Sequence, residues 1–230
     1  NADEPIPPAS LAKLATLAVL GEELDSGRLS LSTPVEVLPG EAWDELPWNS
    51  SAMYLERGMR LTVGDLARGL AVASANDAAF VLARVVSGSV SVFAERMNAV
   101  ARRYGLSVTR FEEPSGLSDR NVTTAREMAA FALAYVAERA DFLASLHSLP
   151  SIDFPLPANF PPGRRIPPGS HPPVLENRNP LLGEYPGCDG LKTGYIAESG
   201  FNFVATAERD GTRFVLVLLG GYAAGTAEAQ

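Results

Sequence analysis

Ser10 and Lys13 are the first residues whose types and spacing suggest chemistry. Residues three apart on a helix share a face, so the Lys13 ammonium can lie beside the Ser10 hydroxyl. A serine hydroxyl becomes a good nucleophile only when a neighbouring base takes its proton. Lysine can be that base where burial or nearby cations lower its pKa. Ser-x-x-Lys also arises by chance in many helices, where the serine is a plain cap, so the pair alone carries little weight.

Ser74-Ala75-Asn76 is a second candidate, at the junction of two expected helices. A loop between helices can direct a hydroxyl and an amide into a cleft. The hydroxyl could relay a proton to a leaving amine, and the amide could hold a substrate backbone. Serine and asparagine also suit caps and turns, which is the better explanation of this motif when it is taken alone.

Lys192-Thr193-Gly194, followed by Tyr195, is a third candidate and lies on an expected strand. A strand edge can pair with an extended peptide through main-chain hydrogen bonds. Lysine and threonine offer a cation and a hydroxyl to a substrate carboxylate. Glycine lets a substrate approach the backbone closely. A chance Lys-Thr-Gly beside a turn is the alternative.

Helical periodicity and capping signals dominate the first two thirds of the chain. Thr62 and Asp65 form a capping-box pair, as do Thr124 and Glu127. The expected helices cover residues 10–27, 62–74, 76–88, 91–105 and 124 to about 140. Residues 28–59 are expected to form turns and small strands. The proline-rich residues 150–180 predict loop or edge structure.

Strand signals dominate the last third. Phe201–Ala207 and Arg213–Leu219 are rich in Val, Leu and Phe and are joined through Asp210-Gly211, a strong hairpin signal. Gly190–Tyr195 is expected to precede them as a strand. We therefore predict a mixed α/β fold, an antiparallel sheet flanked by helices with an inserted, mostly helical lobe. Residues 1–230 are expected to form one catalytic domain, with the helical lobe at roughly 28–145 and the sheet at roughly 185–222.

Composition excludes several classes of partner. The 230 residues carry a formal net charge of −8, and without a long Lys/Arg run they argue against nucleic acid and against a polybasic membrane patch. Cys188 is the single cysteine, so no internal disulfide can form. No stretch approaches the roughly 20 apolar residues that span a bilayer, and no secretory signal is visible. We therefore expect the residues given to be soluble.

The three motifs together are far more informative than each alone. Ser-x-x-Lys, Ser-Asp-Asn and Lys-Thr-Gly are the signature of penicillin-binding proteins and class A β-lactamases, and this chain has the three motifs in order, with Ser-Ala-Asn as the second. The chain resembles the low-molecular-weight penicillin-binding proteins, which are D-alanyl-D-alanine carboxypeptidases with a β-lactamase-like fold. The resemblance covers nearly the whole chain through the blocks PPASLAKLAT, LTVGDLARGLAVASANDAA, EPSGL, NRNPLL, CDGLKTGY and FVATAERDGTRFVLVLLGG.

The resemblance implies a catalytic role for five matching positions. Ser10 would be acylated, with Lys13 as the base for that step. Lys192 would support proton transfer and carboxylate binding. Ser74 and Asn76 would act in proton relay and substrate holding. No metal or other cofactor is implied.

The resemblance also implies the substrate and its binding residues. Thr193, Gly194 and Tyr195 would bind substrate, and the backbone N–H groups of Ser10 and Tyr195 would form the oxyanion hole, each donor typically contributing about 10²–10³ in rate. Ser10 would attack the penultimate D-Ala carbonyl of a peptidoglycan stem peptide, D-alanine would leave, and water would release the shortened peptide. β-Lactams would acylate the same serine. The family works outside the cytoplasmic membrane, often held by a C-terminal anchor that is not in the residues given. The oligomeric state stays open.

Three departures from the family pattern stand out. Ala75 occupies a position that is usually glycine, where its methyl is expected to crowd the loop. The family's two strands before the first motif and its C-terminal helix do not appear, so we expect a core fragment in which the strand 213–219 has an unpaired edge. The arginine that many relatives place just after the last strand is also missing.

Other functions remain as alternatives. A serine β-lactamase needs a deacylating glutamate, typically within Glu-x-x-Leu-Asn, and no such pattern lies between the second and third motifs. A non-catalytic cell-wall scaffold would not trap labelled penicillin. A Ser-His-Asp or zinc hydrolase is disfavoured, because His147 and His171 are the only histidines and are expected to be structural or solvated. Trp43, Trp48 and Tyr54 could bind glycan or another subunit, but core packing is the expected explanation.

Overall fold

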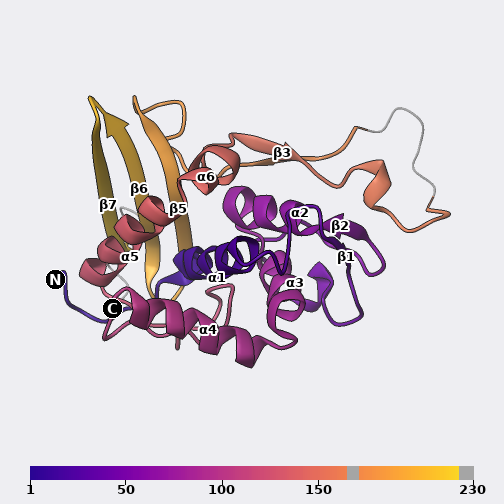
Figure 1. The fold of residues 1–230 in the computed structure, drawn as a ribbon, viewed down its shortest axis with the longest axis horizontal. Coiled ribbons are helices and arrows are strands. Elements are labelled where there is room, and N and C mark those ends of the chain that lie inside the picture. Colours follow the sequence, from indigo (N-terminus) through magenta and orange to yellow (C-terminus); the bar gives the residue numbers. More distant parts are fainter. Residues whose placement is uncertain (165–170, 223–230) are drawn as a thin grey trace.

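The structure is a computed structural model that describes residues 1–164 and 171–222. It confirms the expected mixed α/β fold with an antiparallel sheet flanked by helices (Figure 1). The helices are α1 Lys13–Asp25, α2 Val63–Arg68, α3 Asn76–Ser87, α4 Val90–Arg103, α5 Ala125–Glu138 and α6 Ala140–Phe142. The strands are β1 Pro34–Glu36, β2 Arg60–Thr62, β3 Ser151–Asp153, β4 Val174–Glu176, β5 Cys188–Ile196, β6 Gly200–Arg209 and β7 Thr212–Gly221.

The main sheet has the order β5-β6-β7 and is antiparallel throughout. Its hairpin turns at Asp210 and Gly211, whose φ values of 51° and 73° suit a two-residue turn that matches strand twist. Helix α5 packs against β7 and covers one face of the sheet. Two short pairs, β1 with β2 and β3 with β4, complete the described strands. In this order β5 lies at an edge, where it faces the start of α1.

Helix α1 runs through the centre of the molecule. All but three of its residues are buried, so it shows little of the one-sided pattern of a surface helix. The 3₁₀ turn Ala9–Ala12 precedes it. Ser10 therefore belongs to a tighter turn than the α-helix that the sequence predicts. Figure 1 shows α1 with one end beside β5 and with α2, α3 and α4 around it.

The segment around the second motif begins as predicted and ends irregularly. Thr62 caps α2 and completes the capping box with Asp65. The helix then widens into a π-helical turn, Gly69–Ala73, which ends at Ser74 in the left-handed region. Such turns are rare and frequently occur at functional sites. Helix α3 begins only two residues later.

The second predicted capping box is half correct. Thr124 caps α5 by accepting from the Glu127 amide. The Glu127 carboxylate does not return to Thr124 but accepts hydrogen bonds from the loop at Ser107, Val108 and Thr109. A tertiary contact has replaced the local one.

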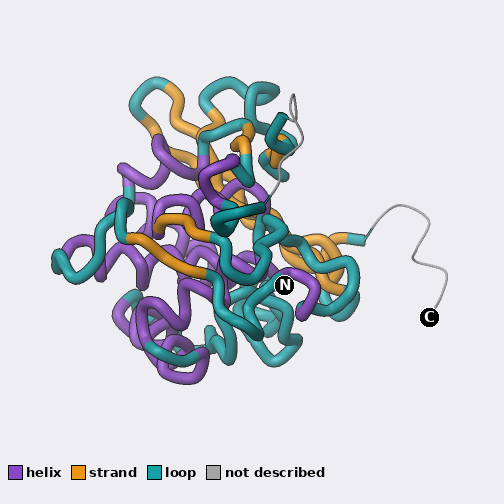
Figure 2. The backbone as a smooth tube through the Cα atoms, turned by 90° about the vertical axis from the view of Figure 1, so that its right-hand side faces the viewer, coloured by secondary structure: helices purple, strands orange, loops and turns teal. Residues whose placement is uncertain are grey.

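The proline-rich segment forms an arm at the surface, where β3 pairs with β4 (Figure 1). This agrees with the predicted loop or edge structure, apart from residues 165–170, which lie outside the described residues. Figure 2 views the molecule from the side opposite the main sheet, where helices and loops predominate. Among the described residues no single helix has the length and hydropathy of a membrane span; α3 and α4 reach them only together, across a bend of 88°.

Candidate active site

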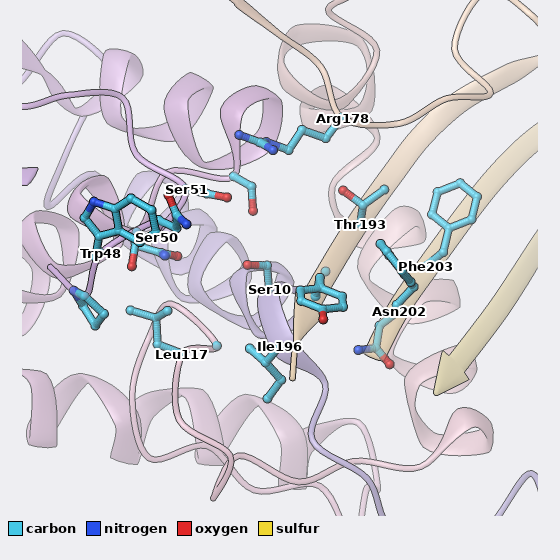
Figure 3. Close-up of a pocket in the computed structure, with 18 of the residues that line it drawn as sticks. Ser10, Trp48, Ser50, Ser51, Leu117, Arg178, Thr193, Ile196, Asn202 and Phe203 are labelled. Carbon is cyan, nitrogen blue, oxygen red and sulfur yellow. The ribbon is translucent and has the colours of Figure 1, made fainter. Parts of the chain in front are cut away.

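The three motifs meet at one cleft of about 660 Å³. Ser10 lies at its floor, between the wall formed by residues 47–51 and the strand β5 (Figure 3). Lys13 and Lys192 are buried. The other six predicted site residues all line the cleft: Ser10, Ser74, Asn76, Thr193, Gly194 and Tyr195.

Lys13 contacts Ser10 directly. Its Nζ lies 2.9 Å from Ser10 Oγ, 2.6 Å from Asn76 Oδ1 and 2.5 Å from the Ser115 carbonyl oxygen. A neutral amine has two N–H groups and one lone pair, and the Asn76 and Ser115 oxygens can only accept. With both N–H groups donated to them, the lone pair faces the Ser10 hydroxyl. This arrangement suits proton transfer from serine to lysine.

The surroundings of Lys13 prepare it to act as a base. Burial lowers the pKa of Lys13 to about 7, against an opposing effect of the Glu113 and Asp77 carboxylates, while the Arg178 charge lowers it further. A substantial fraction of Lys13 is therefore neutral near pH 7. General bases are most effective when their pKa lies near the working pH.

Two glycines press against the turn that carries Ser10. A Cβ at Gly194 would lie 2.8 Å from the Ser10 nitrogen, so β5 approaches this turn too closely for any side chain. The close neighbour of Gly194 is thus the protein's own backbone, in addition to the substrate that the sequence suggests. Gly116 has a φ of 87°, and a Cβ there would collide with the Ala9 carbonyl oxygen. Ala9 itself has a φ of 50°, a strained conformation of the kind that clusters at active sites.

Ser74 and Asn76 reach the cleft from the end of the π-helical turn. Ser74 has φ 58° and ψ 33°, which turns the chain so that both side chains line the cleft. Ala75 has an ordinary φ of −61° and is fully buried in the core. Its methyl therefore packs in the core and does not crowd the loop, contrary to our expectation. The backbone N–H of Asn76 donates to the Ser51 carbonyl oxygen at 2.8 Å, which ties the motif to the opposite wall.

Lys192 is the second buried amine of the site. Its Nζ donates to the Thr193 carbonyl oxygen at 2.8 Å. Burial, together with the charges of Lys13 and Arg178, lowers the pKa of Lys192 well below its usual range. A bound anion would favour its protonated form, so a carboxylate in the cleft would be matched by a charge on Lys192.

Arg178 is a functional candidate that the sequence did not reveal. It lines the cleft near Thr193 (Figure 3), and its Nε donates to the Ala73 carbonyl oxygen at 3.2 Å. Arg178 brings a guanidinium to the cleft from the loop that precedes β5. The block NRNPLL contains it, but only the fold shows that this loop reaches the cleft. The contact with the Ser115 carbonyl could not be predicted from the sequence either, because it is made by a backbone group and not by a side chain.

The prediction that Trp43, Trp48 and Tyr54 pack in the core is wrong. Their exposed fractions are 44%, 90% and 54%. Trp48 sits in a tight turn closed by the hydrogen bond from Ser50 N to Pro47 O, and such a corner projects its side chain outward. Trp48 lines the cleft, while Trp43 and Tyr54 contact each other edge to face with centroids 5.6 Å apart.

The two histidines have structural or solvated surroundings, as expected. His147 is buried; its Nε2 lies 2.8 Å from the Tyr135 hydroxyl and its Nδ1 3.0 Å from the Leu191 carbonyl oxygen. Since the carbonyl can only accept, Nδ1 carries the proton and Nε2 accepts from tyrosine. Burial lowers the pKa of His147 to about 4, although the Leu191 carbonyl opposes this. His171 is exposed in the proline-rich arm.

Comparisons with known proteins identify the family of the chain. Residues 1–223 match the profile of the family described as D-alanyl-D-alanine carboxypeptidase. D-alanyl-D-alanine carboxypeptidase DacC of Escherichia coli is 34% identical over 225 residues, which are 96% of this chain and 52% of that protein. The chain spans about half the length of the curated relatives it matches.

Solved structures give the same result. Penicillin binding protein 5 from Haemophilus influenzae aligns with a TM-score of 0.84 and 31% identity, over 96% of this chain and 60% of that one. Penicillin-binding protein D2 from Listeria monocytogenes, in its cefotaxime-bound form, aligns with a TM-score of 0.78 and 29% identity, over 97% of this chain and 83% of that one.

Proposed function

Because the chain belongs to the D-alanyl-D-alanine carboxypeptidase family, we propose that it removes the terminal D-alanine from peptidoglycan stem peptides through an acyl-enzyme on Ser10. The observation that carries this proposal is the buried Lys13 amine, 2.9 Å from the Ser10 hydroxyl and held by two further acceptors. A helix cap or a solvated lysine would need none of this arrangement.

In the first half of the reaction, Ser10 Oγ attacks the penultimate D-Ala carbonyl carbon and its proton passes to Lys13. The carbonyl oxygen becomes an oxyanion, for which the backbone N–H groups of Ser10 and Tyr195 are the proposed donors. When the tetrahedral intermediate collapses, the C–N bond breaks. The proton then moves to the leaving amine, with the Ser74 hydroxyl as the proposed relay.

In the second half, water attacks the ester on Ser10. Lys13, neutral again, takes a proton from that water. The bond between the acyl carbon and Ser10 Oγ then breaks, Lys13 returns the proton to Oγ, and the shortened peptide leaves with Ser10 restored. Asn76 holds both Lys13 and, in this proposal, the substrate backbone that lies along β5. No step requires a metal or an organic cofactor.

The terminal carboxylate of the substrate is proposed to lie at the end of the cleft near Thr193. Thr193 offers a hydroxyl, Arg178 lines the same region, and Lys192 lies buried next to Thr193. Charge-assisted hydrogen bonds of this kind are about twice as strong as neutral ones. They would also select a free carboxylate over an amide or an ester.

β-Lactams are proposed to acylate the same serine, which the likeness to a cefotaxime-bound penicillin-binding protein supports. We further propose that residues 1–230 act as one catalytic domain, with the helical lobe and sheet bounds given above. Because its substrate lies there, the protein is proposed to work outside the cytoplasmic membrane. Labelling of intact cells with a membrane-impermeant penicillin tests that location, and label confined to lysed cells would contradict it.

Release of D-alanine from a peptide ending in D-Ala-D-Ala tests the proposed reaction. The wild-type protein should release it, whereas Ser10→Ala and Lys13→Ala should each abolish release without loss of folding. A folded wild-type protein that releases none would favour the scaffold alternative. A β-lactamase would instead hydrolyse penicillin quickly and leave no lasting adduct.

A further inference from the structure

We propose that Glu113 is a positioning residue for Lys13. Its carboxylate fixes the turn at residues 115–118 by accepting hydrogen bonds from it, and the Ser115 carbonyl oxygen of that turn orients the Lys13 amine. The inference rests on the proposed function, since it concerns how Lys13 serves as the base. Glu113 does not touch Ser10 or Lys13 in any described hydrogen bond. It acts through the backbone between them.

The Glu113 carboxylate is the centre of a compact turn. Oε1 accepts from the Gly116 amide at 2.6 Å, the Ser118 amide at 3.2 Å and Asn121 Nδ2 at 2.7 Å. Oε2 accepts from the Ser115 amide at 2.6 Å and the Ser115 hydroxyl at 2.5 Å. Five donors thus converge on one side chain, and the backbone that they belong to cannot shift without breaking several hydrogen bonds at once.

The turn held in this way contacts both members of the catalytic pair. Its Ser115 carbonyl oxygen lies 2.5 Å from Lys13 Nζ. One residue on, Gly116 lies against the Ala9 carbonyl beside the nucleophile. One residue before, the Pro114 carbonyl oxygen accepts from Thr16 Oγ1 at 2.7 Å, which fastens the turn to α1. The position of the Lys13 amine therefore depends on the Glu113 side chain.

Orientation of the lone pair is the chemical consequence. The neutral amine points its lone pair at Ser10 only while both N–H groups have acceptors elsewhere. Asn76 supplies one acceptor and Ser115 the other. If the Ser115 carbonyl drifts, the amine is free to rotate an N–H toward Ser10, and it then cannot take the proton.

Charge gives Glu113 a second effect of definite sign. Glu113 and Asp77 both raise the pKa of Lys13, against burial and the Arg178 charge. The nearby Lys192 amine is also buried, and burial and the Lys13 charge lower its own pKa. Removal of the Glu113 charge leaves Asp77 as the remaining anion. Lys13 then loses its proton at a lower pH.

Glu127 provides a matched control within the same part of the chain. Its carboxylate accepts from the amides of Ser107, Val108 and Thr109 and from Thr109 Oγ1. Burial raises its pKa, but these hydrogen bonds outweigh that effect and lower it to about 2. Like Glu113, it organises a loop through backbone amides, but the described hydrogen bonds of Lys13 go to Ser10, Asn76 and Ser115 and not to that loop.

The test is the rate of acylation by a fluorescent penicillin from pH 5 to 9, with melting temperatures, in the wild type, Glu113→Gln and Glu127→Gln. Glu113→Gln should lower the high-pH plateau about 10- to 100-fold, since small misplacements of a catalytic group can cost about 100-fold. The midpoint of the rise in acylation rate with pH should move to lower pH in this variant. Glu127→Gln should keep the wild-type plateau and midpoint while its melting temperature falls.

A Glu113→Gln protein with the wild-type plateau and midpoint would overturn the inference. Should that variant not fold, Glu113→Asp keeps the charge but shortens the side chain by one methylene. It should show a lowered plateau with an unchanged midpoint, and a wild-type plateau there would overturn the positioning role. A wild-type protein that penicillin does not acylate would instead remove the proposed function itself.

Discussion

Lys13 combines two properties that are seldom found together in an amine. It is completely buried, yet it has three polar partners within 2.9 Å. Burial removes the preference for the charged form, and the partners keep the neutral form in one orientation. The residue is thereby suited to accept a proton and to return it within one reaction cycle.

The rate of acylation by penicillin should rise with pH through a midpoint near 7. Burial lowers the pKa of Lys13 to about that value, and only the neutral amine can take the Ser10 proton. Stopped-flow fluorescence from pH 5 to 9 would measure how the acylation rate rises with pH. A midpoint near 10, the ordinary range of lysine, would contradict a lowered pKa for Lys13.

Arg178→Ala should raise the KM for a peptide with a free terminal carboxylate by about 10- to 100-fold, the equivalent of one lost charged hydrogen bond. The measurement belongs on the high-pH plateau, because loss of the guanidinium also raises the pKa of Lys13. The same peptide with a terminal carboxamide is the control and should be affected much less. Equal losses for both peptides would show that Arg178 does not bind the carboxylate.

At the scale of elements, the site depends on the contact between β5 and the 3₁₀ turn before α1. Both are held from outside the site. His147 ties the π-helical turn Leu143–His147 to the Leu191 carbonyl of β5. The Gly116 turn presses on the other side of the Ser10 turn.

Gly194→Ala should slow acylation by about 100-fold, because the new methyl would push β5 away from the Ser10 turn. Gly64→Ala is the control, since its Cβ would lie 3.0 Å from the Leu31 carbonyl oxygen and neither residue lines the cleft. That variant should keep the wild-type rate. If both variants react at the wild-type rate, the β5 contact does not set the position of Ser10.

His147 should make the protein lose stability as the pH falls from about 6.5 to about 4. Its pKa is about 4 in the folded protein and about 6.5 when unfolded, so the unfolded chain binds more protons in this window. The shift corresponds to about 3 kcal/mol. Urea unfolding at pH 7 and pH 4.5 should therefore show a smaller pH effect in His147→Asn. An identical pH effect in both proteins would contradict a neutral, buried His147.

Local signals predicted the regular elements well, and tertiary contacts account for what they missed. The capping box at Thr62 and the hairpin at Asp210-Gly211 each involve neighbours in sequence, so the sequence is sufficient to predict them. The π-helical turn before Ser74 and the distant partners of Glu127 depend on surfaces that form only when the chain folds. No local sequence pattern predicts them.

At the scale of the whole molecule, the candidate site joins residues from position 10 to position 196. Ser10 and Lys13 could be predicted because their spacing is local. Ser74, Asn76 and Lys192 were identified by resemblance, since nothing in the sequence states that they are neighbours. Neither local spacing nor resemblance predicted Arg178 or the Ser115 carbonyl. Arg178 lies on a loop that only the fold brings to the cleft, and the Ser115 carbonyl is a backbone group that no residue type identifies.

The cleft differs from the molecule as a whole in its ionisable groups. The chain carries a formal net charge of −8, whereas the guanidinium of Arg178 lines the cleft and the buried amines of Lys13 and Lys192 lie behind it. No Asp or Glu side chain is among the described residues that line the cleft. Such local fields concentrate ligands of the opposite sign. The site therefore suits a substrate that ends in a carboxylate.

Mass spectrometry of the protein after brief exposure to penicillin detects acylation of Ser10 itself. One covalent adduct is expected on the peptide that contains Ser10, absent from Ser10→Ala and strongly reduced in Lys13→Ala. A folded wild-type protein whose Ser10 peptide stays unmodified, or an adduct on another residue, would contradict acylation of Ser10 with Lys13 as its base.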